Sequence, residues 1–135
     1  MTCFWDGILS KLTLNQINEV LGKKDETLLV VTQKSFIKLL KTNVTYFIDV
    51  RWNNTKISDK LTIELVEWIL DYNEENITQG HDCSICDPFL ILICQLFKVN
   101  IQHTYNGVVV NYRNVRNHEG TILNFSSDSG HFWAS

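Results

Sequence analysis

Proline and glycine are scarce in this sequence, and neither gathers in one place. The 135 residues include one proline, Pro88, and six glycines, so no Pro/Gly-rich linker, low-complexity tract or internal repeat divides the chain. Hydrophobic residues make up 44% of the chain and charged residues 20%, which is ordinary for a globular protein with a real core. We therefore expect a single domain that spans residues 1–135.

The sequence also lacks an excess of positive charge. Twelve Lys and Arg stand against fifteen Asp and Glu, for a net charge of −3. No segment alternates basic and aromatic residues in the way that nucleic-acid-binding surfaces often do. We expect no nucleic-acid partner.

Long apolar runs are absent as well. The longest, Pro88–Cys94, is far shorter than the roughly 20 residues that a membrane-spanning helix needs, so we expect no membrane partner. The first residues show no basic segment followed by an apolar one, which argues against a secretory signal and for a cytoplasmic protein. In that reducing compartment the four cysteines are expected to be thiols.

Helical spacing of apolar residues dominates the first two thirds of the chain. Helix-start signals include a capping box at residues 13–16, single capping residues, and an Asp-Pro pair before an apolar segment. The helix after Ser58 should run for about 13 residues, and the segment 89–97 is apolar nearly all round, which indicates a buried helix. The expected helices begin at or just after Cys3, Thr13, Thr32, Ser58 and Asp87.

Strand-forming segments dominate the last third. Asn106-Gly107 is the dipeptide most favoured in a tight hairpin turn, because both residues tolerate positive φ. This segregation of helices and strands predicts an α+β domain whose sheet is mainly antiparallel. The expected strands are 46–50, 99–105, 108–112, 121–125 and 131–133.

A cysteine and a histidine lie at opposite ends of the chain. Cys3 stands at the start of the first predicted helix, where unpaired N–H groups and the helix dipole stabilise a thiolate. His131 follows Gly130 at the start of the last predicted strand. A thiolate nucleophile requires a base within hydrogen-bond reach, so we predict that the fold brings Cys3 and His131 together.

Read from end to end, the sequence resembles the ovarian-tumour-domain (OTU) cysteine proteases, papain-like deubiquitinases that many viruses also carry. Residues 3–9, CFWDGIL, are similar to the nucleophile helix of that family. Residues 96–101, LFKVNI, and the terminal Gly-His-Phe at 130–132 are similar to its late strands. The resemblance covers roughly the first tenth and the last third of the chain.

The resemblance implies a papain-like OTU-type fold, with N-terminal helices packed on the C-terminal sheet. Cys3 is then the nucleophile and His131 the general base, no cofactor is needed, and the partner is ubiquitin or a ubiquitin-like modifier. We expect a monomer, in the host cytoplasm if the protein is viral. Trp5 and Trp133 flank the pair, and we expect each to lie partly in the core with one edge at the channel for the peptide tail of the substrate.

Two departures from the family pattern bear on the third catalytic residue and on the type of protease. The family usually has Asp-Gly-Asn before the cysteine and Asn or Asp two residues after the histidine, where this chain has Trp133. Asp128 is our first candidate to orient the imidazole and Asn124 the second, and a Cys–His dyad is the alternative. The short N-terminal segment would also suit a viral protease that cuts its own polyprotein.

The sequence is also compatible with other interpretations. The same fold without an oriented histidine would be a catalytically inactive ubiquitin-binding module. His81-Asp-Cys83-Ser-Ile-Cys86 offers soft metal ligands, but no second ligand pair completes a zinc site, so we expect no metal. We predict that Cys94 is a core residue and that His103 is either structural or solvated.

Overall fold

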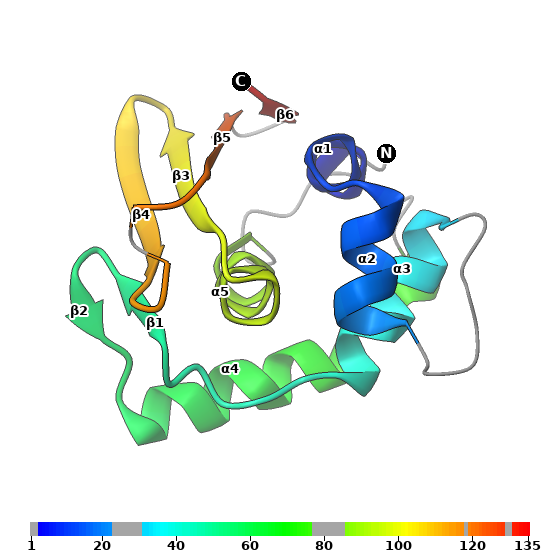
Figure 1. The fold of residues 1–135 in the computed structure, drawn as a ribbon, viewed down its shortest axis with the longest axis horizontal. Coiled ribbons are helices and arrows are strands. Elements are labelled where there is room, and N and C mark those ends of the chain that lie inside the picture. The colour runs from blue at the N-terminus through cyan, green and yellow to red at the C-terminus, as the bar shows by residue number, and fades with distance from the viewer. Residues whose placement is uncertain (1–2, 23–30, 77–85, 118, 129–130) are drawn as a thin grey trace.

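The computed structural model describes residues 3–22, 31–76, 86–117, 119–128 and 131–135, and it has an α+β architecture (Figure 1). The predicted α+β class is therefore confirmed. The described helices are α1 (Cys3–Lys11), α2 (Leu14–Leu21), α3 (Gln33–Thr42), α4 (Asp59–Asp71), the short 3₁₀ helix η1 (Glu74–Asn76) and α5 (Cys86–Phe97).

One mixed sheet holds all the described strands, in the order β2-β1-β4-β3-β5-β6. Neighbours pair antiparallel except β3 and β5, which are parallel. The strands are β1 (Val50–Trp52), β2 (Thr55–Lys56), β3 (Asn100–Tyr105), β4 (Val108–Asn114), β5 (Ile122–Ser127) and β6 (Phe132–Ala134).

Three of the predicted helix caps are confirmed. Thr13 and Thr32 each accept a hydrogen bond from the backbone N–H three residues on, and the backbone N–H of each donates to the side chain of that same residue, which completes a capping box. Ser58 accepts from the N–H of Leu61 and begins the predicted 13-residue helix. Such bonds satisfy N–H groups that have no partner within the helix.

The predicted hairpin between β3 and β4 is also confirmed. Asn106 has a φ of 47° and Gly107 a φ of 83°, so both central residues of the turn occupy the region that this type of hairpin requires. A second hairpin, between β1 and β2, was not predicted. Its turn residues, Asn53 and Asn54, also have positive φ, and asparagine tolerates that conformation better than most residues.

The predicted strand at 46–50 is wrong. Residues 44–49 form a loop that ends in a turn, and the strand β1 begins only at Val50. The backbone N–H of Val50 bonds to the carbonyl of Phe47, so the buried residues Phe47 and Val50 are spaced by a turn. Strand-forming side chains misled the prediction, because Tyr46 and Ile48 point into solvent.

Helix α5 lies at the centre of the molecule, between the sheet and the other helices (Figure 1). It packs against α2, α4 and strands β1, β3 and β4, and residues 89–94 are fully buried, as its apolar sequence predicted. The helices lie on one side of the sheet in Figure 1. The sheet thus has an inner face toward α5 and an outer face that no described helix covers.

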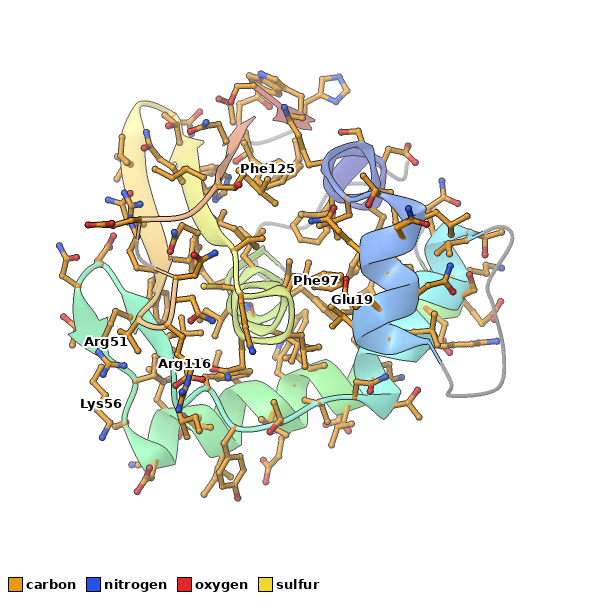
Figure 2. The ribbon with its side chains drawn as sticks, viewed as in Figure 1. Glu19, Arg51, Lys56, Phe97, Arg116 and Phe125 are labelled. Atoms are coloured by element: carbon orange, nitrogen blue, oxygen red, sulfur yellow. The ribbon has the colours of Figure 1, made fainter. Side chains whose placement is uncertain are left out.

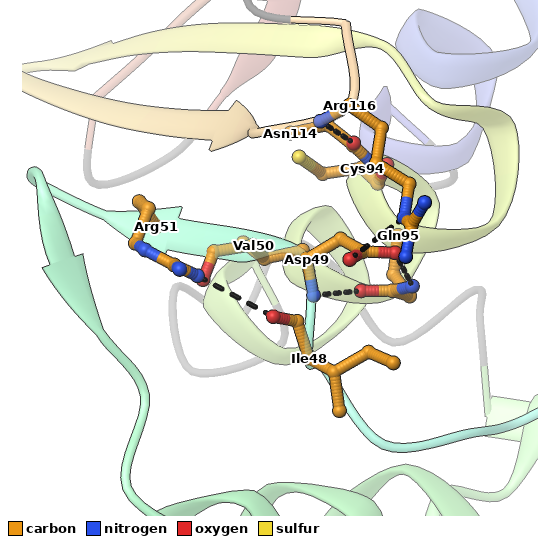
Figure 3. Close-up of polar contacts among 8 residues, drawn as sticks. All are labelled: Ile48, Asp49, Val50, Arg51, Cys94, Gln95, Asn114 and Arg116. Atoms are coloured by element: carbon orange, nitrogen blue, oxygen red, sulfur yellow. Dashed lines mark hydrogen bonds and ion pairs between the residues drawn. The ribbon is translucent and has the colours of Figure 1, made fainter.

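Hydrogen bonds among Asp49, Gln95 and Arg116 connect the end of β4 and the start of β1 to α5 (Figure 3). The Asp49 carboxylate accepts from the Gln95 amide and from Arg116 Nε at 3.1 Å each, and Gln95 Oε1 accepts from the backbone N–H of Asp49. Burial acts to raise the pKa of Asp49, but the hydrogen bonds from Gln95 and Arg116 and the Arg116 charge outweigh it. The pKa is therefore lowered from 3.8.

Candidate active site

The first helix and the last strand lie against each other, although they are at opposite ends of the sequence (Figure 1). The ring of Phe4 lies 4.7 Å from the ring of Phe132, centroid to centroid. A Cβ atom added to Gly7 would lie only 3.0 Å from Cδ1 of Phe132. Phe4 and Phe132 are the residues that follow Cys3 and His131, so the elements carrying the two predicted catalytic residues are in direct contact.

Cys3 is the first residue of α1, and the predicted start of this helix is confirmed. Its side chain lies outside the part of the chain that the structure describes. The predicted contact between the Cys3 thiol and the His131 imidazole therefore stays a prediction.

His131 is exposed and immediately precedes β6. Its backbone N–H donates to Asp128 Oδ1 at 2.7 Å, and its backbone carbonyl accepts from the Asp128 N–H at 2.9 Å. These two bonds connect Asp128 to the backbone of His131, and the prediction that Asp128 orients the imidazole stays a prediction. Asn124, the second candidate, lies exposed in the middle of β5, opposite Gln102 of β3.

The two tryptophans differ in their exposure. Trp133 has 45% of its surface exposed and pairs with Ser126 at the edge of the sheet. Trp5 has only 1% exposed, because its ring packs edge-on against Phe4 and Phe89 in the aromatic core. The expectation that one edge of Trp5 reaches a substrate channel is therefore corrected: Trp5 lies entirely in the core.

A buried histidine beneath β6 was not predicted to have a specific role. His103 on β3 is 4% exposed, its Nε2 lies 2.6 Å from Ser127 Oγ, and its ring lies 5.3 Å from the Phe132 ring. The predicted alternatives for His103 were structural and solvated, and the structural one is confirmed. The alternation of side chains along a strand could have predicted this burial, since His103 lies two residues from the buried Ile101 on the same face of β3.

The remaining predicted thiol and metal residues lie elsewhere. Cys94 is a fully buried free thiol of α5, as predicted, and burial raises its pKa to about 12. His81, Cys83 and the side chain of Cys86 lie outside the described residues. Within the described ranges, no group of three metal-ligating side chains is found, and no helix is long and apolar enough to cross a bilayer.

Comparisons of the chain with protein-family models, with curated proteins and with solved structures found no match.

Proposed function

We propose that this protein is a cysteine protease or isopeptidase that removes ubiquitin or a ubiquitin-like modifier, with Cys3 as nucleophile and His131 as general base. The observation that carries the proposal is the packing of α1 against β6, through Phe4, Gly7 and Phe132. The resemblance to the OTU proteases, on residues 3–9, 96–101 and 130–132, supplies the substrate class.

Helix geometry supports the proposed pairing. Positions 3 and 7 are one turn apart and lie on the same face of an α-helix. Gly7 faces Phe132, so that face of α1 is turned toward the strand that His131 precedes.

The chemistry would follow the usual order for a thiol protease. The Cys3 thiolate attacks the carbonyl carbon of the modifier's C-terminal peptide bond, and unpaired N–H groups at the start of α1 stabilise the oxyanion. The His131 imidazolium then protonates the leaving amine, which leaves a thioester on Cys3. Water, deprotonated by His131, hydrolyses the thioester and regenerates the thiolate.

Two residues have supporting roles in this proposal. Asp128 fixes the backbone of His131 and is thus a positioning residue, and its negative charge would stabilise the imidazolium. Trp133, exposed beside His131, remains a candidate contact for the extended peptide tail of the modifier.

The direct test is covalent labelling by ubiquitin that carries an electrophile at its C-terminus. Wild type should be labelled, Cys3→Ala should not, and His131→Ala should be labelled far more slowly. Cys94→Ala is the matched control, because it removes a buried thiol that plays no part in the mechanism. Labelling of folded Cys3→Ala at the wild-type rate would refute the assignment of the nucleophile.

The role of Asp128 can be tested separately. Asn at this position keeps the oxygen that accepts from the His131 N–H but removes the charge, whereas Ala removes both. If Asp128 stabilises the imidazolium, Asp128→Asn should slow labelling and shift its pH profile. If it only holds the backbone, Asp128→Asn should match wild type and Asp128→Ala alone should be slow.

A catalytically inactive ubiquitin-binding module is the second candidate function. It is favoured by Trp133, which stands at the position where the OTU pattern has Asn or Asp. Binding of ubiquitin without any labelling by the electrophilic probe would support the module. Cleavage of a peptide from the protein's own precursor, with no reaction toward ubiquitin, would support a viral processing protease.

A further inference from the structure

The segment that carries His131 begins and ends at one pair of residues. Ser127 is the last residue of β5 and Phe132 the first of β6, and the two are directly opposite each other in the antiparallel pairing of these strands. The connection between them contains Asp128 and His131, which are joined by the two hydrogen bonds described above. The position of His131 therefore depends on how Ser127 and Phe132 are held.

One buried side chain of β3 contacts both residues of this pair. His103 Nε2 lies 2.6 Å from Ser127 Oγ, and the His103 ring lies 5.3 Å from the Phe132 ring, at an angle of 49°. His103 is directly opposite Phe125 of β5, two residues before Ser127, so the imidazole reaches diagonally along the inner face of the sheet. Figure 2 shows Phe125, which shares this face, between β5 and α1.

The hydrogen bond between His103 and Ser127 lies in apolar surroundings. Both side chains are buried, and the buried apolar residues of the same three strands are Ile101, Leu123, Phe125 and Phe132. A polar group buried in such a place is destabilising unless it is hydrogen-bonded. A hydrogen bond is also directional, so this one fixes the end of β5 relative to β3 more narrowly than an apolar contact would.

Phe132 extends the contact from His103 to the first helix. Its ring stacks on Phe125 at a centroid distance of 5.2 Å and lies 4.7 Å from the ring of Phe4 on α1. The Phe132 ring is thus held between the sheet and α1, with His103 on the sheet side. A change at His103 should therefore alter the strand that His131 precedes.

We propose that His103 is a positioning residue for His131. Through Ser127 it fixes the residue that precedes Asp128. Through Phe132 it fixes the residue that follows His131. This inference rests on the proposed function, in which His131 is the general base. A base must lie within hydrogen-bond distance of the group it serves, and a displacement of about 1 Å can lower a rate about 100-fold.

Amide hydrogen exchange tests the positioning without any enzymatic reaction. The reporters are the backbone N–H of His131, which donates to Asp128 Oδ1, and the backbone N–H of Asp128, which donates to the His131 carbonyl. Ser127→Ala should speed the exchange of both about tenfold or more, because the end of β5 loses its bond to β3. Ser58→Ala is the matched control, since it removes the same kind of hydroxyl from the cap of α4, and it should leave both rates unchanged.

A double variant separates positioning from stability. His103→Phe/Ser127→Ala removes both polar groups and keeps an aromatic ring beside Phe132. Its free energy of unfolding in urea should therefore lie close to that of wild type and above that of Ser127→Ala. If the bond positions the segment, the His131 N–H should still exchange about tenfold faster than in wild type. If the bond serves stability alone, exchange should return to the wild-type rate.

Labelling by the ubiquitin electrophile connects the positioning to the proposed reaction. In the double variant the labelling rate at saturating probe should fall about tenfold or more, while the probe concentration for half of that rate should stay within about twofold. Ser127→Thr keeps the hydroxyl and should label faster than Ser127→Ala. Ser58→Ala should label at the wild-type rate.

The results for His103 and for the proposed function are distinguishable. A wild-type chain that the probe does not label, with faster His131 exchange in the double variant, would count against the protease and support the role of His103 in fixing the segment. A labelled wild type, with a double variant that exchanges and reacts like it, would overturn that role and leave the protease intact. Equal acceleration of exchange in Ser58→Ala and Ser127→Ala would also overturn it, because any loss of stability would then suffice.

Discussion

The contact between α1 and β6 can be measured through Gly7. Replacement by alanine in a helix interior normally stabilises by about 1 kcal/mol, because glycine loses more backbone entropy on folding. Here the new methyl group would lie 3.0 Å from Cδ1 and 3.1 Å from Cε1 of Phe132, and overpacking of a core costs about 1–3 kcal/mol. We expect Gly7→Ala to lower the free energy of unfolding by a net amount of up to about 2 kcal/mol.

A double-mutant cycle separates the two contributions. Phe132→Leu shortens the side chain that the new methyl group meets, so in that background Gly7→Ala should keep its gain in helix propensity and become neutral or stabilising. Urea denaturation of the four proteins should give a coupling energy of about 1–2 kcal/mol. A stabilisation of about 1 kcal/mol by Gly7→Ala in both backgrounds would show that α1 does not rest on Phe132, and would remove the main support for pairing Cys3 with His131.

Three further predictions concern other parts of the fold. Asp49 has a lowered pKa, so its contribution to stability is complete above pH 3.8 and is lost as the pH falls through the lower pKa of the folded state. In urea titrations, the free energy of unfolding of Asp49→Asn should therefore fall less steeply with acid than that of wild type. With a pKa of about 12 and full burial, Cys94 should react with a disulfide reagent only after denaturant is added. Gly107→Ala meets no neighbouring atom within 4 Å but has a φ of +83°, so calorimetry should show a loss of about 1 kcal/mol from backbone strain alone. These expectations would be contradicted if Cys94 reacted rapidly in the native protein, or if the unfolding free energies of wild type and Asp49→Asn fell equally with acid. A Gly107→Ala variant as stable as wild type would contradict the last one.

Local signals predicted most of the elements of this fold. Thr13, Thr32 and Ser58 act as caps through bonds to residues only three positions away, and the φ values of Asn106 and Gly107 depend on those residues alone. The buried α5 was also visible, because an uninterrupted apolar segment has no polar side to turn toward water.

The predictions that were wrong concern residues whose environment is determined by distant parts of the chain. Tyr46 and Ile48 have the composition of a strand, but none of the described strands pairs with them, and they remain in a loop. Trp5 was expected at a channel, but packing with Phe36 and Phe89, both far away in the sequence, seals it in the core.

The sequence by itself determined the helices, the hairpin turn and the chemical types available at the chain's two ends, because caps, turns and amphipathic spacing depend on neighbours within about one helical turn. Only the tertiary structure decided that α1 rests on β6, that Asp128 holds the backbone of His131, and that His103 is buried beside Ser127. Those arrangements depend on strand order and on packing around α5, which join residues that no local pattern relates.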